Sequence, residues 1–298
     1  MPASAATATR HATWGLIALF CVLWSSAFAA AKIALRDCPP LILLTVRFFV
    51  AGLLMLAWAA ATKSLPRMRM RELMQLAILG VLNSGLYLGL SWSGMTTVSS
   101  AFAAILISTN PLLTGVFAGP ILGERMHARK LIGLVLGLAG VVIVLRSRLS
   151  SLSGGMHEDL RGALLVTGGL LSLVAGTLAF KRLKPTAPLW TATGVQSMAA
   201  AVAVAPFAWH NESLAQLHPT HSLFWSMSYS IAAVSIGGYA LWFTILSRNS
   251  ATSASALHFL MPPLGLFFGW LVLGEIVSWP DMLGIVPIAI GIWLVTRG

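Results

Sequence analysis

Long apolar runs separated by short polar links dominate the chain. Hydrocarbon requires about 20 apolar residues for one helical crossing, and ten stretches approach or reach that length. We therefore predict an all-α integral membrane protein with no soluble domain. The ten predicted transmembrane helices are 14–32, 40–61, 73–93, 98–122, 129–146, 160–180, 188–209, 223–247, 251–273 and 280–296.

One of these runs, from Ser99 to Glu124, has a proline near its middle. Pro111 cannot donate a backbone hydrogen bond and clashes with the preceding turn. It would leave the carbonyl of Ile107 without its helical donor, which is tolerated in a bilayer only beside protein or a wet cavity. The run therefore predicts a bent helix next to a cavity.

The same pattern recurs later in the chain. A shift of 151 residues places Pro111 on Pro262, and Leu122-Gly123-Glu124 on Leu273-Gly274-Glu275. Further matches at shifts of 151 and 152 are Gly133 with Gly284, Gly140 with Gly291, Gly85 with Gly237 and Tyr87 with Tyr239. We predict two five-helix repeats, residues 1–150 and 151–298, joined by the Ser/Gly-rich link 147–159.

The basic residues predict the orientation of these helices. If the N-terminus is cytoplasmic, thirteen Lys and Arg residues lie in inner segments and five in outer links, while Arg47 lies within a span. Positive charge favours the inside, so both termini are predicted to be cytoplasmic. Because each repeat has an odd number of helices, the second is inverted relative to the first. Inverted repeats around a site near mid-membrane are typical of transporters.

Composition supports a membrane protein and argues against other classes. Of the 298 residues, 57% are hydrophobic and 9% charged, far from the composition of a soluble domain. The net charge of +11 comes from the links, so we do not expect nucleic-acid binding. Residues Ala27-Phe28-Ala29 could also be read as a signal-peptide cleavage site, but cleavage there would leave the repeats unequal.

Several kinds of chemistry find no support in the sequence. The eight acidic residues lie in links or at span ends: Asp37, Glu72, Glu124, Glu158, Asp159, Glu212, Glu275 and Asp281. No carboxylate is therefore predicted at mid-membrane for proton relay or cation binding. The chain has no Gly-rich phosphate loop, zinc-ligand spacing or paired nucleophile and base. We predict no catalytic residue, no metal and no cofactor.

Two polar residues lie beside the prolines. His258 is one turn before Pro262, and an intramembrane histidine is a candidate functional residue, although a neutral imidazole bonded to a neighbouring helix would also explain it. Asn110 precedes Pro111 and could face a solute or hold helices together. The position matching Asn110 is Met261, which is apolar and adaptable.

Other candidates lie on the first, third, sixth and eighth predicted helices. Asn83 and Tyr87 lie within about one turn of each other, and Tyr239 occupies the position matching Tyr87. Trp24 and Ser25 could stack on and hydrogen-bond an amphipathic solute, or Trp24 could simply fill space between helices. In the second repeat the sixth helix offers only Ser172 at the matching place.

Packing explains several remaining features. The glycines Gly133, Gly140, Gly284 and Gly291 are expected to allow close helix approach. Arg47 lies about 10 Å along its helix from Pro40 at 1.5 Å per residue, so it could snorkel outward or pair with a carbonyl. Glu124 ends its helix, where a carboxylate opposes the helix dipole, and it should pair with a neighbouring donor.

These motifs resemble the drug/metabolite transporter superfamily, and within it the ten-helix EamA-like exporters of bacteria. The resemblance rests on Trp24-Ser25-Ser26, Arg47-Phe48-Phe49, and Pro111 followed by Leu122-Gly123-Glu124. It implies a plasma-membrane exporter with a cavity lined by helices 1, 3, 4, 6, 8 and 9. Small four-helix relatives couple to protons through a first-helix glutamate, which this chain lacks.

The sequence thus predicts a monomeric exporter of amino acids or similar small metabolites, working by alternating access in the bacterial inner membrane. Pro111 and Pro262 would let their helices bend during gating. The predicted substrate-binding residues are Trp24, Ser25, Asn83, Tyr87, Asn110, Ser172, Tyr239 and His258. Alternatives are efflux of lipophilic cations, transport of phosphorylated solutes, a membrane enzyme and a scaffold. Efflux of lipophilic cations would require a buried carboxylate, and transport of phosphorylated solutes would require several buried cations. A membrane enzyme would require a set of reactive side chains, and a scaffold would be expected to have unequal repeats.

Overall fold

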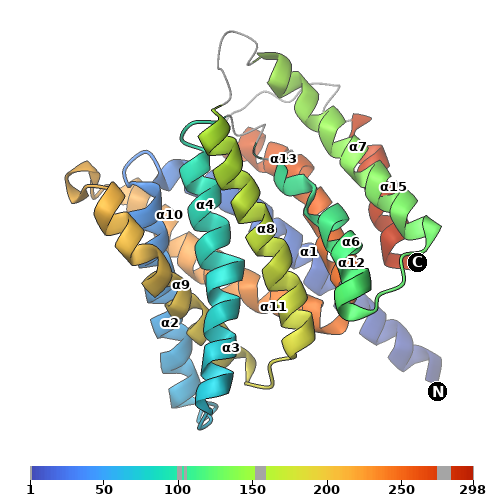
Figure 1. Ribbon diagram of the computed structural model, residues 1–298, viewed down its shortest axis with the longest axis horizontal. Coiled ribbons are helices and arrows are strands. Elements are labelled where there is room, and N and C mark those ends of the chain that lie inside the picture. Colours follow the sequence, from blue (N-terminus) through green and yellow to red (C-terminus); the bar gives the residue numbers. More distant parts are fainter. Residues whose placement is uncertain (1, 99–102, 104–105, 152–158, 274–282, 298) are drawn as a thin grey trace.

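The computed structural model describes residues 2–98, 103, 106–151, 159–273 and 283–297 (Figure 1). Throughout these residues the regular secondary structure is helical. The α-helices are α1 (Pro2–Ala34), α2 (Pro40–Ala61), α3 (Met70–Gly80), α4 (Tyr87–Gly94), α6 (Asn110–Leu122), α7 (Ala128–Ser151), α8 (Leu160–Leu183), α9 (Leu189–Asn211), α10 (His221–Tyr229), α11 (Tyr239–Arg248), α12 (Ala251–Ala256), α13 (Met261–Leu273) and α15 (Ile285–Arg297). Short π and 3₁₀ segments join some of them: η1 (Val81–Leu86), η2 (Leu214–Gln216), η3 (Ser230–Gly238) and η4 (Leu257–Leu260).

Seven continuous helical stretches are long and apolar enough to cross a membrane, and each coincides with a predicted span. They are Gly15–Ala34, Pro40–Ala61, Met70–Gly94, Leu160–Leu183, Leu189–Asn211, His221–Arg248 and Ala251–Val272. The predicted span 40–61 matches α2 at both ends.

The three other predicted spans have weaker counterparts. Spans 98–122 and 280–296 lie partly outside the described residues, and their described parts are the shorter apolar helices Leu106–Leu122 and Ile285–Thr296. Span 129–146 lies within α7, which is not among the seven. A count of ten crossings is therefore still a prediction.

Both proline-containing runs depart from a regular α-helix, as predicted, over a short stretch in each. In the first, Thr109 is a turn residue whose backbone stays in the right-handed helical region, and α6 begins at Asn110, with Pro111 in its first turn. In the second, the 3₁₀ segment η4 separates α12 from α13, and Pro262 lies in the first turn of α13. Proline is tolerated at this position because the first-turn N–H groups have no helical acceptor.

Two π-helical segments occupy matching positions in the repeats. Segment η1 ends at Leu86 and η3 ends at Gly238, which is its equivalent at a shift of 152. Each segment is followed directly by one of the paired tyrosines, Tyr87 or Tyr239. π-Bulges often occur at functional sites, and here they set where these two tyrosines point.

Glycines bring α7 and α15 into close contact. A Cβ atom added to Gly133 would lie 2.7 Å from the carbonyl oxygen of Gly291, and one added to Gly140 would lie 2.6 Å from that of Gly284. A forward step along α7 is thus a backward step along α15, so the two helices are antiparallel. Gly133 matches Gly284 in sequence and Gly140 matches Gly291, so each contact is the other's counterpart, as in a two-fold interface.

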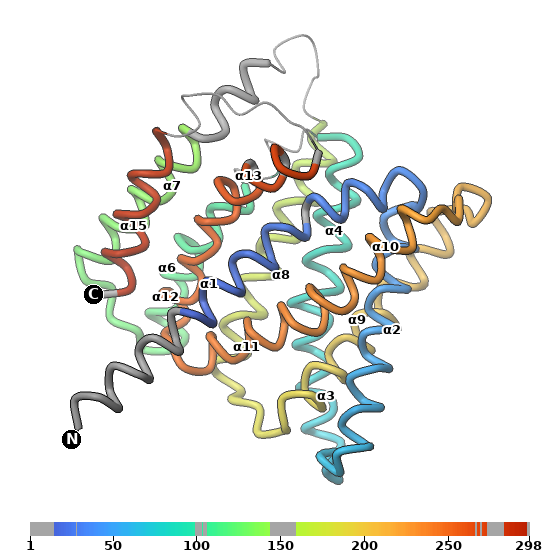
Figure 2. The backbone as a smooth tube through the Cα atoms, turned by 180° about the vertical axis from the view of Figure 1, so that it is seen from behind, coloured from blue at the N-terminus to red at the C-terminus, as the bar shows by residue number. Residues whose placement is uncertain are grey.

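Two further helix pairs are also antiparallel. Helix α2 contacts α9 from Glu212, whose carboxylate accepts the N–H of Leu41 at 2.8 Å, to Thr191, whose hydroxyl donates to Ser64 O at 2.8 Å. Helix α4 packs on α8, where a Cβ on Gly94 would lie 2.6 Å from Gly162 O. Both views place α7 and α15 on one side of the molecule and α2, α9 and α10 on the other (Figures 1 and 2).

Candidate functional site

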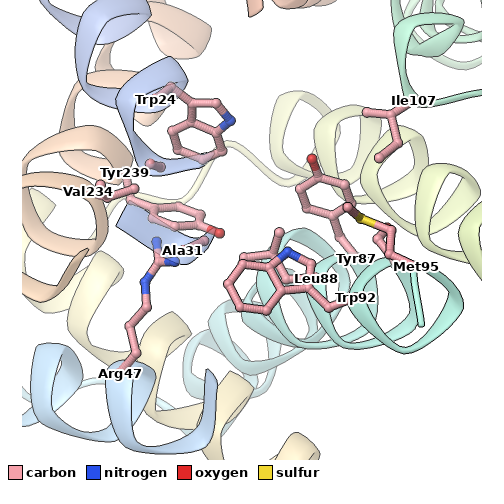
Figure 3. A pocket seen from close by; sticks show the side chains of 12 residues that line it. Trp24, Ala31, Arg47, Tyr87, Leu88, Trp92, Met95, Ile107, Val234 and Tyr239 are labelled. Carbon is pink, nitrogen blue, oxygen red and sulfur yellow. The ribbon is translucent and has the colours of Figure 1, made fainter. Parts of the chain in front are cut away.

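A cavity with aromatic walls lies among α1, α2, α4, η3 and α11 (Figure 3). Its larger side chains are Trp24, Arg47, Tyr87, Trp92, Met95 and Tyr239. Small residues, among them Ala27 and Ala31 of α1, leave the space between the rings. The cavity lies among elements of both predicted repeats.

The paired tyrosines belong to this cavity. Tyr87 and Tyr239 are 3% and 4% exposed, and the rings line the space from different helices (Figure 3). The Tyr239 ring meets Trp24 edge-on, with 4.9 Å between centroids and 64° between planes. This geometry is favourable for aromatic pairs, so the packing fixes both rings before any ligand arrives.

Arg47 forms the polar part of the wall. It is 3% exposed, its Nε donates to Ser235 Oγ at 2.7 Å, and its guanidinium lies beside the Tyr239 ring (Figure 3). Ser91, which is also buried, lines the same space. The walls therefore combine large apolar rings with one fixed cation.

Three of the eight predicted substrate-binding residues line this cavity: Trp24, Tyr87 and Tyr239. Ser25 is next to Trp24 and fully buried, but it is not among the lining residues, and its hydroxyl has no hydrogen-bond partner within the described chain. A role for any of these residues in binding a substrate remains a prediction.

Asn83 and Ser172 lie between helices rather than in the cavity wall. Asn83 packs against Gly176, where an added Cβ would lie 2.6 Å from the amide. Its Nδ2 donates to Leu79 O at 3.1 Å. Ser172 Oγ donates to Leu82 O at 2.9 Å, a carbonyl within the π segment η1, where regular helical pairing is disturbed. Both side chains thus support the segment that orients Tyr87.

Asn110 and His258 lie at the two helix breaks and also away from the lining. Asn110 is fully buried, and its Oδ1 accepts from Thr114 Oγ1 at 3.2 Å. His258 is 2% exposed, with Nδ1 3.0 Å from Ser255 O and its ring edge-on to Trp242 at 5.0 Å. The histidine therefore packs into the apolar cluster around Trp242 in this conformation.

The sequence reasoning missed Arg47, Trp92, Met95 and Ser91. Trp92 lies near a span end, where a tryptophan usually belongs to the interfacial belt, but in the structure it lines the cavity. Arg47 was expected to serve packing or to snorkel. The available signal was a lone basic residue inside an otherwise uncharged span, and no residue spacing indicated that its side chain would contact Ser235.

Polar contacts join α6, α8, α11 and α12 where these helices meet. Glu124 accepts from Ala251 N at 2.6 Å and from Thr252 Oγ1 at 2.8 Å. Lys181 Nζ donates to Asn249 O at 2.7 Å. Glu124 thus pairs with the N-terminus of α12. These N–H and hydroxyl groups are the neighbouring donors expected for a carboxylate at the C-terminal end of a helix. Glu275, the counterpart of Glu124, lies outside the described residues.

The side chains of the cavity wall are suited to binding a small molecule. Among the described residues, no group of three or more His, Cys, Asp or Glu side chains could hold a metal ion. The wall contains no pairing of a nucleophile with a base. The wall suits an amphipathic small molecule that would contact aromatic rings on several sides and the Arg47 guanidinium on one side.

Comparison with known proteins agrees with this architecture. The model of the EamA-like transporter family matches residues 12–146 and again 160–297. One solved crystal structure superposes on this chain with a TM-score of 0.81, and the match covers 96% of this chain and 97% of the chain in that structure. The two sequences are 19% identical, so the comparison shows a shared fold.

Two curated relatives are similar over nearly the full length. "Uncharacterized inner membrane transporter YedA" of Escherichia coli K12 is 28% identical over 95% of this chain and 90% of its own. A "Probable amino-acid metabolite efflux pump" of the same organism is 25% identical over 94% and 93%. Because the family model matches almost the whole chain in two copies, the protein belongs to the EamA-like transporter family.

Proposed function

We propose that the protein exports amino acids or related small metabolites across the bacterial inner membrane by alternating access. The observation that carries the proposal is the aromatic cavity, to which Tyr87 and Tyr239 contribute from matching positions of the two repeats. A ligand there would contact both halves at once, as alternating access requires. The relatives named as an inner-membrane transporter and as an amino-acid metabolite efflux pump favour the location and the solute class.

The architecture we propose has ten crossings in two inverted five-helix repeats. Support comes from the antiparallel contact of α7 with α15, because equivalent glycines meet reciprocally there. The cavity residues Trp92 and Met95 lie toward the C-terminal end of α4, on the predicted outer side, whereas the Glu124 contacts close the predicted inner side. The structure would then represent an outward-facing conformation.

The driving force we propose is the solute gradient. The carboxylates in the described chain lie at helix termini and in links, as the sequence analysis expected, and such sites do not relay protons through mid-membrane. Transport would thus proceed without a proton gradient. An enzymatic role finds no support in the cavity chemistry.

Reconstitution tests the proposal directly. Proteoliposomes containing the full chain should take up members of a radiolabelled amino-acid panel with no pH gradient, and Trp24→Ala should lower the rate about tenfold, since one lost aromatic contact is worth about 1.4 kcal/mol in binding. Trp209→Ala is the matched control, because Trp209 is 85% exposed. Thermal melting should show that both variants fold. Absence of movement for the whole panel would refute the function, and equal rates for the two variants would refute the role of the aromatic cavity in it.

A further inference from the structure

Arg47 is a buried cation with unused hydrogen-bonding capacity. Its side chain reaches the cavity from α2, and its Nε–H donates to Ser235 Oγ. A guanidinium carries five N–H donors, and the bond to Ser235 is the one it makes to described residues. The Phe48 ring, with its centroid 5.9 Å from Cζ, adds a contact but no acceptor.

The described carboxylates are all committed elsewhere. Asp37 accepts from Thr220 and Ser222, Glu72 from Arg69 N, Glu124 from Thr252, Asp159 from Gly162 N and Glu212 from Leu41 N. The three remaining acids, Glu158, Glu275 and Asp281, lie outside the described residues. A buried charge is costly unless it is paired, so the part of the chain that the structure describes leaves Arg47 in need of an anion.

We propose that Arg47 binds the carboxylate of the transported solute and that this contact selects the substrate class. The class is a monocarboxylate with a bulky apolar or aromatic body, which would lie among Trp24, Trp92 and the paired tyrosines. A planar guanidinium matches a carboxylate with two parallel hydrogen bonds. The inference rests on the proposed function, and it adds the group that the site recognises.

The cavity disfavours the other charge classes. A lipophilic cation would meet the fixed positive charge of Arg47 and no described carboxylate. A phosphorylated solute carries about two charges, whereas the cavity wall contains one basic residue. An ammonium group on the same solute is compatible, because aromatic faces attract cations. Carboxylate recognition therefore fits both a zwitterionic amino acid and a simple organic acid.

Matched acid and amide probes isolate this contact. We would measure binding to the purified full chain by calorimetry with 3-phenylpropionate against 3-phenylpropionamide, and with phenylalanine against phenylalaninamide. In at least one pair the acid should bind about tenfold or more tightly than its amide, the scale expected for a charge-assisted hydrogen bond. If neither acid binds better than its amide, the inference is wrong.

Variants assign the preference to one residue. Arg47→Gln should abolish the acid–amide difference, and Arg47→Lys should retain part of it, because lysine keeps the charge but loses the two-pronged geometry. Arg182→Gln is the control, since Arg182 donates to Ile121 O on the exposed surface and the preference should persist. If Arg47→Gln does not fold, Arg47→Lys decides: a preference equal to that of the unmodified chain overturns the inference.

Transport measurements separate this inference from the proposed function. If the chain binds the acids with the stated preference but moves no solute in vesicles, the function fails and the carboxylate site stands. If vesicles transport phenylalanine and Arg47→Gln leaves its KM unchanged, the function stands and the role of Arg47 is refuted.

Discussion

Cys38 illustrates how local environment decides the behaviour of a single residue. It lies in the link between α1 and α2, is 4% exposed, and is close to the Glu212 carboxylate. Burial, reinforced by the negative charge of Glu212, raises the pKa of the Cys38 thiol from 9.0 to about 11. At neutral pH the group is therefore an uncharged thiol, and the thiolate is the reactive form.

We expect Cys38 to react with a water-soluble maleimide at least about a hundredfold more slowly in the folded protein than in the unfolded chain, because two pKa units reduce the thiolate fraction by that factor. In the folded protein the rate should keep rising with pH toward 11, whereas in the unfolded chain it should level off near 9. The Cys21→Ser variant makes Cys38 the sole thiol. Similar rates in the two states would contradict the assigned environment.

The sequence predicted the cavity residues that are aromatic and either lie in the middle of a span or match a residue of the other repeat. Trp24 is a mid-span tryptophan, and Tyr87 and Tyr239 match at a fixed shift. Asn83, Ser172 and Asn110 share the same depth and polarity, but the structure places them in helix contacts. Whether a polar side chain faces a cavity or another helix depends on helix rotation, which no residue spacing in one sequence specifies.

At the scale of elements, Glu124 joins α6 to the N-terminus of α12 across the two repeats. The carboxylate accepts two backbone N–H groups and one hydroxyl there, and a helix N-terminus favours negative charge. Glu124→Gln removes the charge and should favour opening of this end about tenfold, which corresponds to about 1.4 kcal/mol.

A cysteine at Met261 would report this opening. Met261 is 6% exposed and packs in the apolar cluster with Trp242 and Leu257, ten residues along the chain from the Ala251 N–H that Glu124 accepts. In a background lacking Cys21 and Cys38, Met261→Cys should be labelled from the inner side about tenfold faster when Glu124→Gln is present. Glu72→Gln is the control, because Glu72 bonds only to the backbone of its own helix start. Equal labelling with and without Glu124→Gln would show that Glu124 does not hold the closure.

The elements that the sequence predicted well are those with a strong local signal, such as a proline or a change from apolar to charged residues. Helix α2 is bounded by Pro40 at one end and by the change to a polar, basic link at the other, and its predicted limits agree with the structure. The breaks at Pro111 and Pro262 were expected because proline has a definite stereochemical effect. The π segments η1 and η3 were not anticipated, since their residues would equally suit an α-helix and tertiary contacts such as that of Ser172 stabilise them.

At the scale of the whole molecule, the reciprocal glycine contacts bear on the relation between the repeats. Two parallel copies would bring equivalent helices together in the same direction. Instead α7 and α15, which contain equivalent glycines, run in opposite directions, and so do α2 and α9, the second helix of each predicted repeat. Inverted copies require an odd number of crossings in each, so these contacts favour an odd number of crossings per repeat and an even total.

An even total would place both chain ends on one face, and the distribution of Lys and Arg predicts that this face is the cytoplasm. In Figure 1 the free ends of α1 and α15 lie toward the same end of the molecule as the α2–α3 link, which contains three basic residues, and the α8–α9 link, which contains Lys184. Epitope tags at the N- and C-termini should therefore be protected from antibody or protease in intact spheroplasts and become accessible once the inner membrane is permeabilised. A tag inserted in the predicted outer link 147–159 should be reached without permeabilisation, which shows that the reagents work. If one terminal tag is accessible from outside and the other is not, the number of crossings is odd, and the repeats cannot be inverted copies of five.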